Sequence, residues 1–432
     1  MKFVIIGAGI SGLYCAYMLS TKYNINDIII LEKSNVIGGR IQTKYLKTGE
    51  ILEMGASKVL SNYKSLLNLI DLLGIKKNLI INTNKPERLH YDIDTIFNND
   101  KINYEIKSKQ DMYESDFYNI IEELFIKILD KKFYKIAKNF TLYGLIEKIY
   151  GINKADEMRD QFGYVNDFIK QNAIDGIIMF KTAFAKDNYF YSMKNGLSEI
   201  IFKLAEYLKN NNINIRLNHK CEDIIKNYDN TFKIIINNNG NFTNITADNV
   251  ILAIPNFNLI EISYLQKIKY LLDSVINKSL IRVYLRFPLI NNKVWFDEIN
   301  GAITTSTILK QIIPINKKTG ILMIYCDGDG ADNLNYLTKS DDNQLKNEII
   351  LNLRRLFKNV SEPIEIYYKY WFAATTLWKP SYESIILSEK IIKPIENENL
   401  FIVGESFSLT QQWSSGALDS VDKFLKLYMI NK

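Results

Sequence analysis

Three glycines near the start of the chain have the type and spacing of a phosphate-binding loop. Gly7, Gly9 and Gly12 form the pattern G-x-G-x-x-G. In such a loop the first glycine permits a tight turn, the second lets the backbone approach a pyrophosphate, and the third lets a helix pack closely on a strand. Ile10 and Ser11 lie inside the pattern, where free N–H groups at the start of a helix favour an anion. The spacing therefore predicts a dinucleotide-binding site.

The stretches around this loop are the elements that would hold it in place. Apolar residues 3–6 predict a strand directly before the loop, and residues 13–19 predict a helix directly after it. Residues 28–31 predict a second strand, and Glu32 stands at its end. A carboxylate about 20 residues after the loop can bind both ribose hydroxyls. Because these parts occur in the required order, we expect a Rossmann-like α/β fold here.

The composition limits the other classes of function. The chain has 432 residues, which allows roughly two or three domains. Its net charge of +6 is small for this length, so we expect no nucleic-acid partner. Three separated cysteines and two histidines predict no disulfide framework, no metal site and no His-based catalysis. No apolar run reaches about 18 residues and the first strand starts at residue 3, so we expect a cytoplasmic protein without a membrane partner.

Two further stretches of small residues follow. The first is a Gly-Gly-Arg sequence that ends in Gly39 and Arg40, whose guanidinium could pair with a phosphate. The second is Gly55-Ala56-Ser57, whose small side chains suit packing against a flat ring. Together with Glu32, these stretches resemble the flavin-containing amine oxidase superfamily, which includes monoamine, polyamine and L-amino-acid oxidases. Since NAD enzymes do not normally carry both stretches, the resemblance implies FAD as the cofactor.

The end of the chain carries a further part of the resemblance. A strand-like apolar run leads into Gly404 and Glu405, and the final helix opens near Gly416 and Ala417. This order is similar to the family's closing motif, Gly-Glu-x-x-Ser followed by aromatic-x-x-Gly-Ala. The resemblance implies that Glu405 holds ribityl or phosphate-linked oxygens. It also implies that the N–H groups near Gly416 and Ala417 face flavin O2 and stabilise charge on the reduced ring.

Two departures from the family bear on how FAD is held. Cys221 stands where relatives place a valine whose backbone holds the adenine, and a main-chain contact does not require valine. We therefore expect Cys221 among the cofactor-binding residues, with its thiol as a buried apolar filler. Relatives with covalently attached flavin have a cysteine shortly after the counterpart of Trp371, whereas residues 375–381 contain none. The resemblance thus implies non-covalent FAD.

The rest of the chain is expected to form a second domain. Residues 86–189 have a largely helical pattern, with helices expected at 117–131, 142–150 and 157–170. Alternating apolar residues predict an antiparallel sheet with strands at 280–287, 312–315, 321–325 and 364–370. We expect a discontinuous FAD-binding domain of residues 1–85, 190–262 and 385–432. Its inserted α+β substrate domain, a mixed sheet plus helices, would contain residues 86–189 and 263–384.

The resemblance implies an enzyme that dehydrogenates a C–N bond. The substrate carbon would transfer hydride to flavin N5, and molecular oxygen would reoxidise the flavin to give peroxide. An apolar, aromatic-lined site would favour the neutral form of the amine substrate. Arg282 stands where relatives have a lysine bonded through water to N5, and Trp413 where they have an aromatic residue of the amine cage. Lys58 stands where amino-acid oxidases of this group have an arginine for the substrate carboxylate.

Other readings of the same residues are open at this point. An L-amino-acid oxidase on the same fold is the nearest rival, and Lys58 favours it slightly. An FAD isomerase or desaturase and a non-catalytic flavoprotein that binds a partner are two further classes. Among the side chains, Trp413 could be a core residue, Lys58 a solvated surface residue, and Arg282 could reach solvent or pair with an acid. The sequence predicts neither the individual amine nor the oligomeric state.

Overall fold

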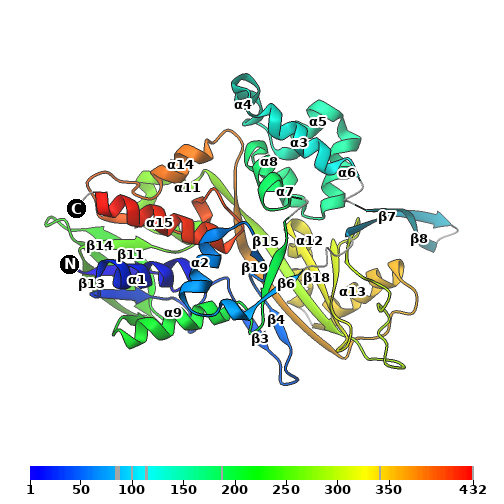
Figure 1. Ribbon diagram of the computed structural model, residues 1–432, viewed down its shortest axis with the longest axis horizontal. Coiled ribbons are helices and arrows are strands. Elements are labelled where there is room, and N and C mark those ends of the chain that lie inside the picture. The colour runs from blue at the N-terminus through cyan, green and yellow to red at the C-terminus, as the bar shows by residue number, and fades with distance from the viewer. Residues whose placement is uncertain (83–87, 99–100, 112–114, 186–187, 340–341, 431–432) are drawn as a thin grey trace. The chain divides into compact units, whose positions relative to one another are not determined.

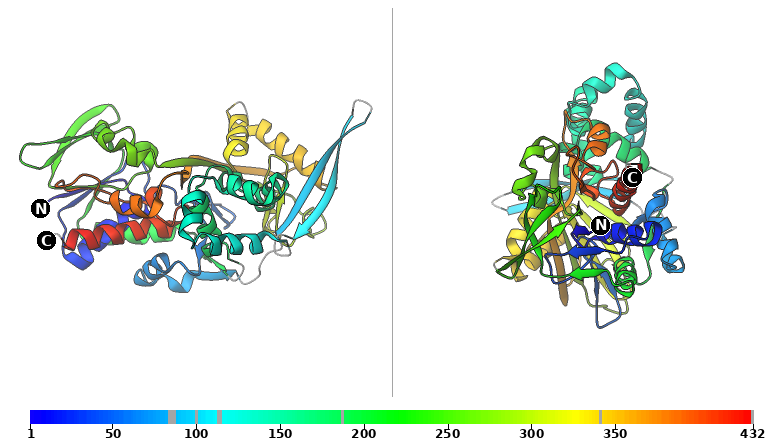
Figure 2. Two further views of the ribbon diagram at one scale, coloured as in Figure 1. Left: turned by 90° about the horizontal axis from the view of Figure 1, so that it is seen from above. Right: turned by 90° about the vertical axis from the view of Figure 1, so that its left-hand side faces the viewer.

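The computed structural model describes residues 1–82, 88–98, 101–111, 115–185, 188–339 and 342–430. Its contacts divide the chain into two compact units. The first unit contains Met1–Asn82, Tyr189–Asn277 and Thr375–Lys432, and the second contains Thr83–Asn188 and Lys278–Ala374. The elements of each unit can be followed in Figure 1 and Figure 2.

A five-stranded parallel sheet forms the centre of the first unit, with the strand order β10-β2-β1-β14-β20. Its strands are β1 (Phe3–Ile6), β2 (Ile28–Leu31), β10 (Asn214–Arg216), β14 (Asn249–Leu252) and β20 (Leu400–Ile402). Every residue of β1 and β14 is buried, as expected for parallel strands that are covered on both faces. The predicted Rossmann-like α/β fold is confirmed.

Helices cover one face of this sheet and a second sheet covers the other. The helices α1 (Ile10–Tyr23), α9 (Ser198–Asn210) and α15 (Ser414–Ile430) share an apolar core with alternate residues of β1 and β2 (Figure 1). The opposite face contributes Val4 and Ile6 to a second core. That core includes residues of the antiparallel sheet β11 (Lys220–Lys226), β12 (Phe232–Asn238) and β13 (Asn241–Ala247).

Shorter elements complete the first unit and set its boundaries. They are β3 (Thr43–Tyr45), β4 (Ile51–Glu53), β5 (Val59–Leu60), α2 (Lys64–Leu72), η1 (Lys76–Asn78), β6 (Leu79–Asn82), β9 (Phe190–Met193), α10 (Asn256–Leu259), η2 (Ser263–Ile268), α11 (Lys269–Leu272), α14 (Ser384–Lys390) and η3 (Glu405–Phe407). Leu265, Leu271 and Trp378 are buried in the second core. For this reason the first unit extends to residue 277 and resumes at 375, whereas the sequence placed these boundaries at 262 and 385.

A seven-stranded sheet forms the centre of the second unit, in the order β19-β15-β18-β17-β16-β7-β8. Its strands are β7 (Arg88–Asn98), β8 (Lys101–Asp111), β15 (Val275–Arg286), β16 (Ala302–Thr305), β17 (Gln311–Asn316), β18 (Ile321–Asp327) and β19 (Glu365–Trp378). Of the expected strands, β15 and β17 both pair antiparallel with β18, but β16 pairs parallel with β7, so the sheet is mixed. The antiparallel pair β7 and β8 corrects the expectation of a helical pattern from residue 86, because residues 89–94 alternate between apolar and polar as a strand does.

Helices make up the remainder of the second unit. They are α3 (Phe117–Lys127), α4 (Lys131–Ala137), α5 (Leu142–Tyr150), α6 (Ile152–Phe162), α7 (Val165–Ile169), α8 (Ala173–Thr182), α12 (Gly328–Thr338) and α13 (Asp342–Leu356). The single helix expected at 157–170 is wrong, since Gly163 has a φ of +77° and ends α6 before α7 begins. The helices α12 and α13 lie in a segment where the sequence pattern had indicated only strands.

The described part of the chain contains no candidate for a membrane-spanning helix and no candidate metal-binding group. No helix there has both the length and the hydropathy needed to cross a membrane. No group of three or more His, Cys, Asp or Glu side chains there is arranged to hold a metal ion.

Candidate functional site

The predicted phosphate-binding loop joins β1 to α1. The backbone of Gly7 has a φ of +105°, and a side chain on Gly12 would come within 2.0 Å of the Gly7 carbonyl oxygen, so both positions require glycine. In contrast, apart from the adjacent residues Ala8 and Ile10, no described residue has an atom within 4 Å of the place that a Gly9 side chain would occupy. The start of α1 has no side-chain cap and no acidic residue in its first turn. The first-turn N–H groups, which include those of Ile10 and Ser11, therefore border open space that suits a pyrophosphate.

Glu32 follows β2 and lies against this loop. The residue is 7% exposed. Its Oε2 accepts a hydrogen bond from the N–H of Ala8 at 2.8 Å, and its Oε1 accepts one from the N–H of Ser34 at 2.9 Å. The carbonyl oxygen of Glu32 accepts a bond from the N–H of His219 at 2.8 Å, just before the start of β11. The fold thus brings the glycine loop, the carboxylate and β11 together, and the carboxylate retains acceptor sites for further donors.

Cys221 lies on β11, where the pairing with β12 shifts register. The side chain is half-buried, and its Sγ lies 3.8 Å from the carbonyl oxygen of Asp223. Burial, followed by the negative charges of Asp223 and Glu222, raises the pKa of Cys221 to about 12. The thiol is therefore protonated at neutral pH, which makes it a poor nucleophile.

The Gly-Gly-Arg stretch lies directly on the glycine loop. Gly38 and Gly9 form an isolated parallel bridge. Gly39 has a φ of +57°, and a side chain there would lie 3.4 Å from the Cα of Gly9. The next residue, Arg40, extends to Glu405, and its Nη1 lies 2.8 Å from Oε2 of that carboxylate. A guanidinium is thereby held next to the loop that would bind the phosphates.

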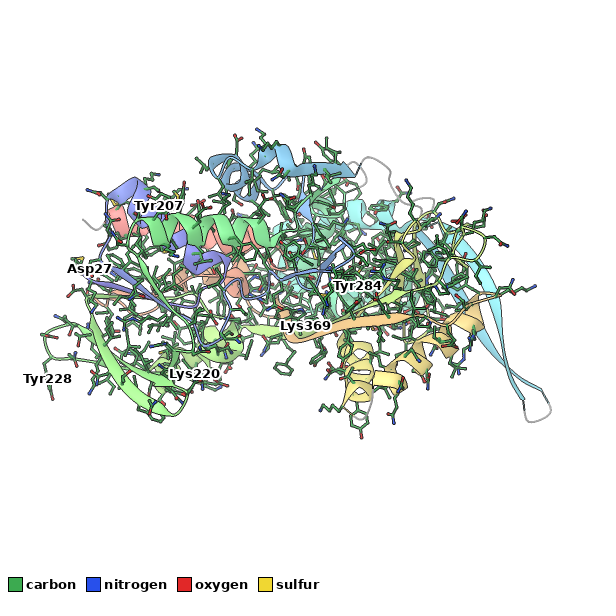
Figure 3. All side chains as sticks on the ribbon, turned by 90° about the horizontal axis from the view of Figure 1, so that it is seen from below. Asp27, Tyr207, Lys220, Tyr228, Tyr284 and Lys369 are labelled. Atoms are coloured by element: carbon green, nitrogen blue, oxygen red, sulfur yellow. The ribbon has the colours of Figure 1, made fainter. Side chains whose placement is uncertain are left out.

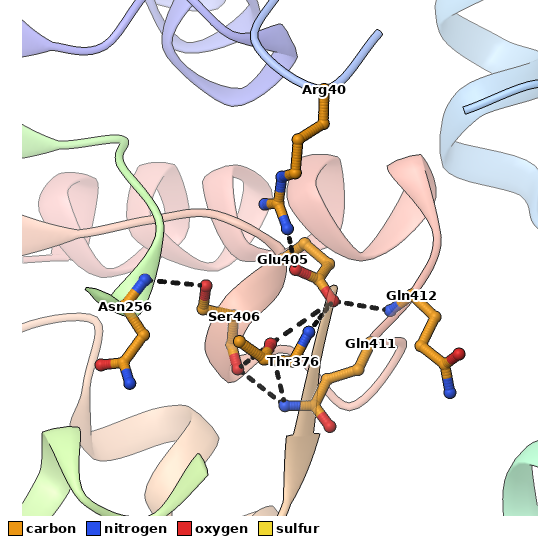
Figure 4. Close-up of polar contacts among 7 residues, drawn as sticks. All are labelled: Arg40, Asn256, Thr376, Glu405, Ser406, Gln411 and Gln412. Carbon is orange, nitrogen blue, oxygen red and sulfur yellow. Dashed lines mark hydrogen bonds and ion pairs between the residues drawn. The ribbon is translucent and has the colours of Figure 1, made fainter. Parts of the chain in front are cut away.

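Glu405 joins segments that are far apart in the sequence (Figure 4). It lies in η3 and is 5% exposed. Its Oε2 accepts from Arg40, while its Oε1 accepts from the N–H of Gln412 at 2.7 Å and the N–H of Thr376 at 3.2 Å. Oε1 thus accepts from two backbone N–H groups and Oε2 from a guanidinium, whereas the resemblance implied that this carboxylate holds oxygens of the cofactor.

A buried polar network next to Glu405 was not predicted from the sequence. The Nε2 of Gln411 donates to the carbonyl oxygen of Ser406 at 2.7 Å (Figure 4), and its Oε1 accepts from the N–H of Trp378 at 2.9 Å. The Oγ of Ser406 accepts from the N–H of Asn256 at 3.2 Å. The pair of adjacent glutamines after the Gly-Glu motif was the available sequence signal, because amides can donate and accept at once.

The small residues Gly55, Ala56 and Ser57 lie under the Arg40 segment. The N–H of Ala56 donates to the carbonyl oxygen of Arg40 at 3.0 Å. A side chain on Gly55 would come within 2.0 Å of the same oxygen, so only glycine fits there. Ala56 and Ser57 are partly exposed. The segment therefore offers a shallow surface of small side chains, as packing against a flat ring requires.

The closing motif lies beside the glycine loop. Gly404 has a φ of +137°, and a side chain on it would lie 3.8 Å from the Oγ of Ser11. Gly416 and Ala417 lie at the start of α15, and the first turn of this helix has no acidic residue. A side chain on Gly416 would come within 2.1 Å of the carbonyl oxygen of Thr410. The two ends of the chain thus place two helix N-termini, those of α1 and α15, in one unit with the Glu405 network.

Trp413 belongs to a partly exposed aromatic group. Its ring lies edge-to-face with Tyr63, with centroids 5.6 Å apart, and stacks with Phe190 at 6.0 Å. Lys58 is exposed, and its Nζ lies 3.5 Å from the Oγ of Ser192. Because Phe190 and Ser192 are two residues apart on β9, they share one face of that strand. Trp413 and Lys58 therefore contact side chains on the same face of β9.

Arg282 is a buried residue of the second unit. It lies opposite Tyr325 in the pairing of β15 with β18, and its guanidinium carbon is 4.7 Å from the centre of that ring. Tyr284, labelled in Figure 3, lies two residues further along the same strand. Burial opposes the positive charge, whereas Tyr325 and Tyr284 favour it, and the net effect raises the pKa of Arg282. The side chain therefore stays cationic and does not reach solvent.

Comparisons with known proteins extend over nearly the whole chain. A family model described as flavin containing amine oxidoreductase matches residues 10–420. Polyamine oxidase 5 of Oryza sativa subsp. japonica is 25% identical over 97% of this chain and 87% of its own. An L-amino-acid oxidase of Sistrurus catenatus edwardsii is 22% identical over 97% of this chain and 85% of its own. A solved structure of a putrescine oxidase variant has the same fold, with a TM-score of 0.77 and 15% identity over 100% of this chain and 99% of that one.

Proposed function

Because the chain belongs to the family of flavin-containing amine oxidoreductases, we propose that it is an FAD-dependent oxidase that acts on the C–N bond of an amine. The observation that carries the proposal is the open space at Gly9, bordered by the uncapped start of α1 and by Glu32. When bound, FAD supplies the acceptor for a hydride from the substrate carbon, and oxygen then takes up the electrons as peroxide.

The first unit offers a residue for each part of the dinucleotide. The N–H groups after Gly9 would bind the pyrophosphate, with Arg40 as a nearby cation. Glu32 would accept the ribose hydroxyls, and the main chain at Cys221 would contact the adenine. Glu32 and β11 are joined by a backbone hydrogen bond, which supports placing the ribose and the adenine next to each other.

The flavin ring would lie against small residues and a helix N-terminus. Gly55, Ala56 and Ser57 would pack on the ring, and the N–H groups near Gly416 and Ala417 would stabilise negative charge on it. The absence of cysteine from 375–381 supports non-covalent attachment.

We assign Glu405 a different role from the one that the resemblance implied. Its oxygens accept from Arg40, Thr376 and Gln412, so its main effect is to orient Arg40 towards the phosphates.

Two side chains are proposed to act on the reacting atoms. Trp413, together with Tyr63 and Phe190, would form an aromatic wall that excludes water and disfavours the ammonium form of the substrate. Arg282, the counterpart of the family's lysine, would stabilise negative charge as the flavin is reduced and as oxygen is activated. Two observations support this assignment: Arg282 stands on β15 at the position where relatives have a lysine, and its side chain is buried.

An amino-acid oxidase is the second candidate, and the position of Lys58 favours it. Its ammonium contacts Ser192 on the same face of β9 as the Trp413 group. A cation next to an aromatic wall could bind a substrate carboxylate while the wall packs on the side chain. In that case Lys58 would set the substrate class.

Purified protein and a panel of substrates test these proposals. We expect a yellow protein whose FAD stays in the supernatant after acid precipitation, and peroxide release with at least one primary amine, polyamine or L-amino acid. Turnover of L-amino acids that is lost in Lys58→Met would identify the second candidate. A colourless protein that neither binds added FAD nor releases peroxide would overturn both.

A further inference from the structure

The second unit contains a buried cluster of three charges that the sequence did not reveal. Lys278, Asp167 and Asp327 are each at most 2% exposed. The Nζ of Lys278 lies 2.9 Å and 2.8 Å from the two carboxylate oxygens of Asp167, and 3.7 Å from Oδ2 of Asp327. Burying three charges costs free energy that their mutual attraction does not always recover, so stability alone is a weak explanation for such a cluster.

The two carboxylates fix the bend between α6 and α7. Asp327 accepts from the N–H of Val165 at 3.1 Å and from the N–H of Asn166 at 3.2 Å, so it caps the start of α7 from β18. Asp167 lies in the first turn of the same helix. The bend at Gly163 is therefore attached to two adjacent strands of the sheet, through Lys278 on β15 and Asp327 on β18.

The bend presents Tyr164 to the sheet. Its ring lies 4.8 Å from the Nζ of Lys278 and edge-to-face with Tyr325, with centroids 5.4 Å apart and an interplanar angle of 85°. Tyr325 in turn lies under the guanidinium of Arg282. A continuous row of contacts within one unit thus leads from one cation through two rings to another cation, in the order Lys278, Tyr164, Tyr325 and Arg282.

The geometry of the sheet explains why this row exists. Lys278 and Arg282 are four residues apart on β15, so their side chains share a face. Tyr325 lies opposite Arg282, and Asp327 lies two residues further along β18, on the same face. Tyr164 is the member of the row that comes from outside the sheet, and its ring closes the gap between the two cations.

We propose that Tyr164, anchored by Lys278 and its two carboxylates, is a positioning residue that fixes Tyr325 and thereby the guanidinium of Arg282. The proposal rests on the role assigned above to Arg282 at the flavin. Without the Tyr164 ring, Tyr325 has a cavity beside it and can change its rotamer, and the guanidinium that packs on it can follow. Displacement of a reacting group by about 1 Å can cost up to about 100-fold in rate.

The test uses the FAD-loaded full-length protein and needs no identified substrate. The midpoint potential of the bound flavin is measured, and photoreduced enzyme is mixed with oxygen to follow reoxidation. Arg282→Met provides the reference, because loss of a nearby cation should lower the potential and slow the reaction with oxygen. We expect Tyr164→Leu to lower the potential in the same direction and to slow reoxidation roughly tenfold.

A rescue variant and a control variant separate positioning from general stability. Tyr164→Phe keeps the ring and should return both measurements close to wild type. Tyr143→Leu removes a ring of α5 whose centre lies 5.7 Å from the guanidinium carbon of Arg159. This change should lower the melting temperature without changing the midpoint potential of the flavin. If Tyr164→Leu does not fold, Tyr164→Met takes its place, because methionine fills irregular space.

The double variant distinguishes the positioning role of Tyr164 from the role of Arg282 at the flavin. In an Arg282→Met background, Tyr164→Leu should add no further shift in potential, since both changes act through the same guanidinium. An unchanged potential in Tyr164→Leu, with a shift in Arg282→Met, would overturn the positioning role and leave the role of Arg282 intact. An unchanged potential in Arg282→Met itself would overturn the assignment of Arg282 and the positioning role with it.

Discussion

Lys278 and Arg282 share one face of β15, and their cationic groups meet different partners. The ammonium of Lys278 lies 2.8 Å from Oδ2 of Asp167, whereas the guanidinium of Arg282 packs 4.7 Å above the ring of Tyr325. A carboxylate partner neutralises a buried cation, while an aromatic face attracts a cation and leaves its net charge in place. This difference separates a cation that fixes the fold from the one that we propose acts at the flavin.

Glu32 should be required for tight binding of FAD. Replacing it with alanine removes a buried carboxylate that we assign to the ribose hydroxyls, and the loss should be on the order of 1.5–3 kcal/mol. This corresponds to a rise in Kd of about 10- to 150-fold. Titration of apoprotein with FAD, followed by flavin fluorescence, measures the change. Glu206→Ala is the control, because Glu206 pairs with Lys203 on the exposed side of α9. Equal Kd values for the two variants would contradict the ribose role.

Glu405 should act on FAD through Arg40. Glu405→Gln replaces a charge-assisted contact with Arg40 and should weaken FAD binding by about 1.5–3 kcal/mol. In an Arg40→Met background, the same change should have little further effect on the Kd, because one interaction connects the two residues. Additive losses in the double variant would instead support direct contact between Glu405 and the cofactor.

Trp413 should affect kinetics more than stability. Trp413→Phe changes the shape of a partly exposed aromatic group, so KM or kcat for the best substrate should change while the melting temperature stays close to wild type. Trp378→Phe is the matched control, because Trp378 is 1% exposed and donates from Nε1 to Ser408 at 3.0 Å. The control should lose roughly 1–3 kcal/mol of stability. A large loss of stability in Trp413→Phe with normal kinetics per bound flavin would identify a core residue.

Cys221 should make stability sensitive to alkaline pH. The folded thiol has a pKa of about 12, above its ordinary value of 9.0, so the unfolded chain loses this proton first. The contribution of the protonated Cys221 thiol to the free energy of unfolding is fully present below the ordinary pKa, and it is lost as the pH rises through about 12. Cys221→Val removes this dependence, and its urea midpoint should fall less than that of wild type between about pH 8 and about pH 11. The affinity for FAD should be unchanged, because only the main chain at this position is assigned to the adenine.

The glycine loop shows how much of the site the sequence by itself determined. Gly7, Gly9 and Gly12, the flanking strand and helix, and the following Glu32 all appear in the structure as predicted. Each depends on neighbours that are close in the chain, where residue type sets φ, burial and helix or strand period directly. The same holds for Gly416 at the start of α15 and for most predicted strands.

Other features were decided only by the tertiary structure. Arg40 and Glu405 are 365 positions apart, and no local pattern indicates that they form an ion pair. Lys278, Asp167 and Asp327 come from β15, α7 and β18, and each alone has the sequence appearance of a solvated charge. Strand β7 pairs with β16, roughly 200 residues later in the chain, so its partner is set by the sheet as a whole. Local residue types determine conformation and periodicity, whereas the pairing of buried charges and of distant strands depends on which surfaces the folded chain brings together.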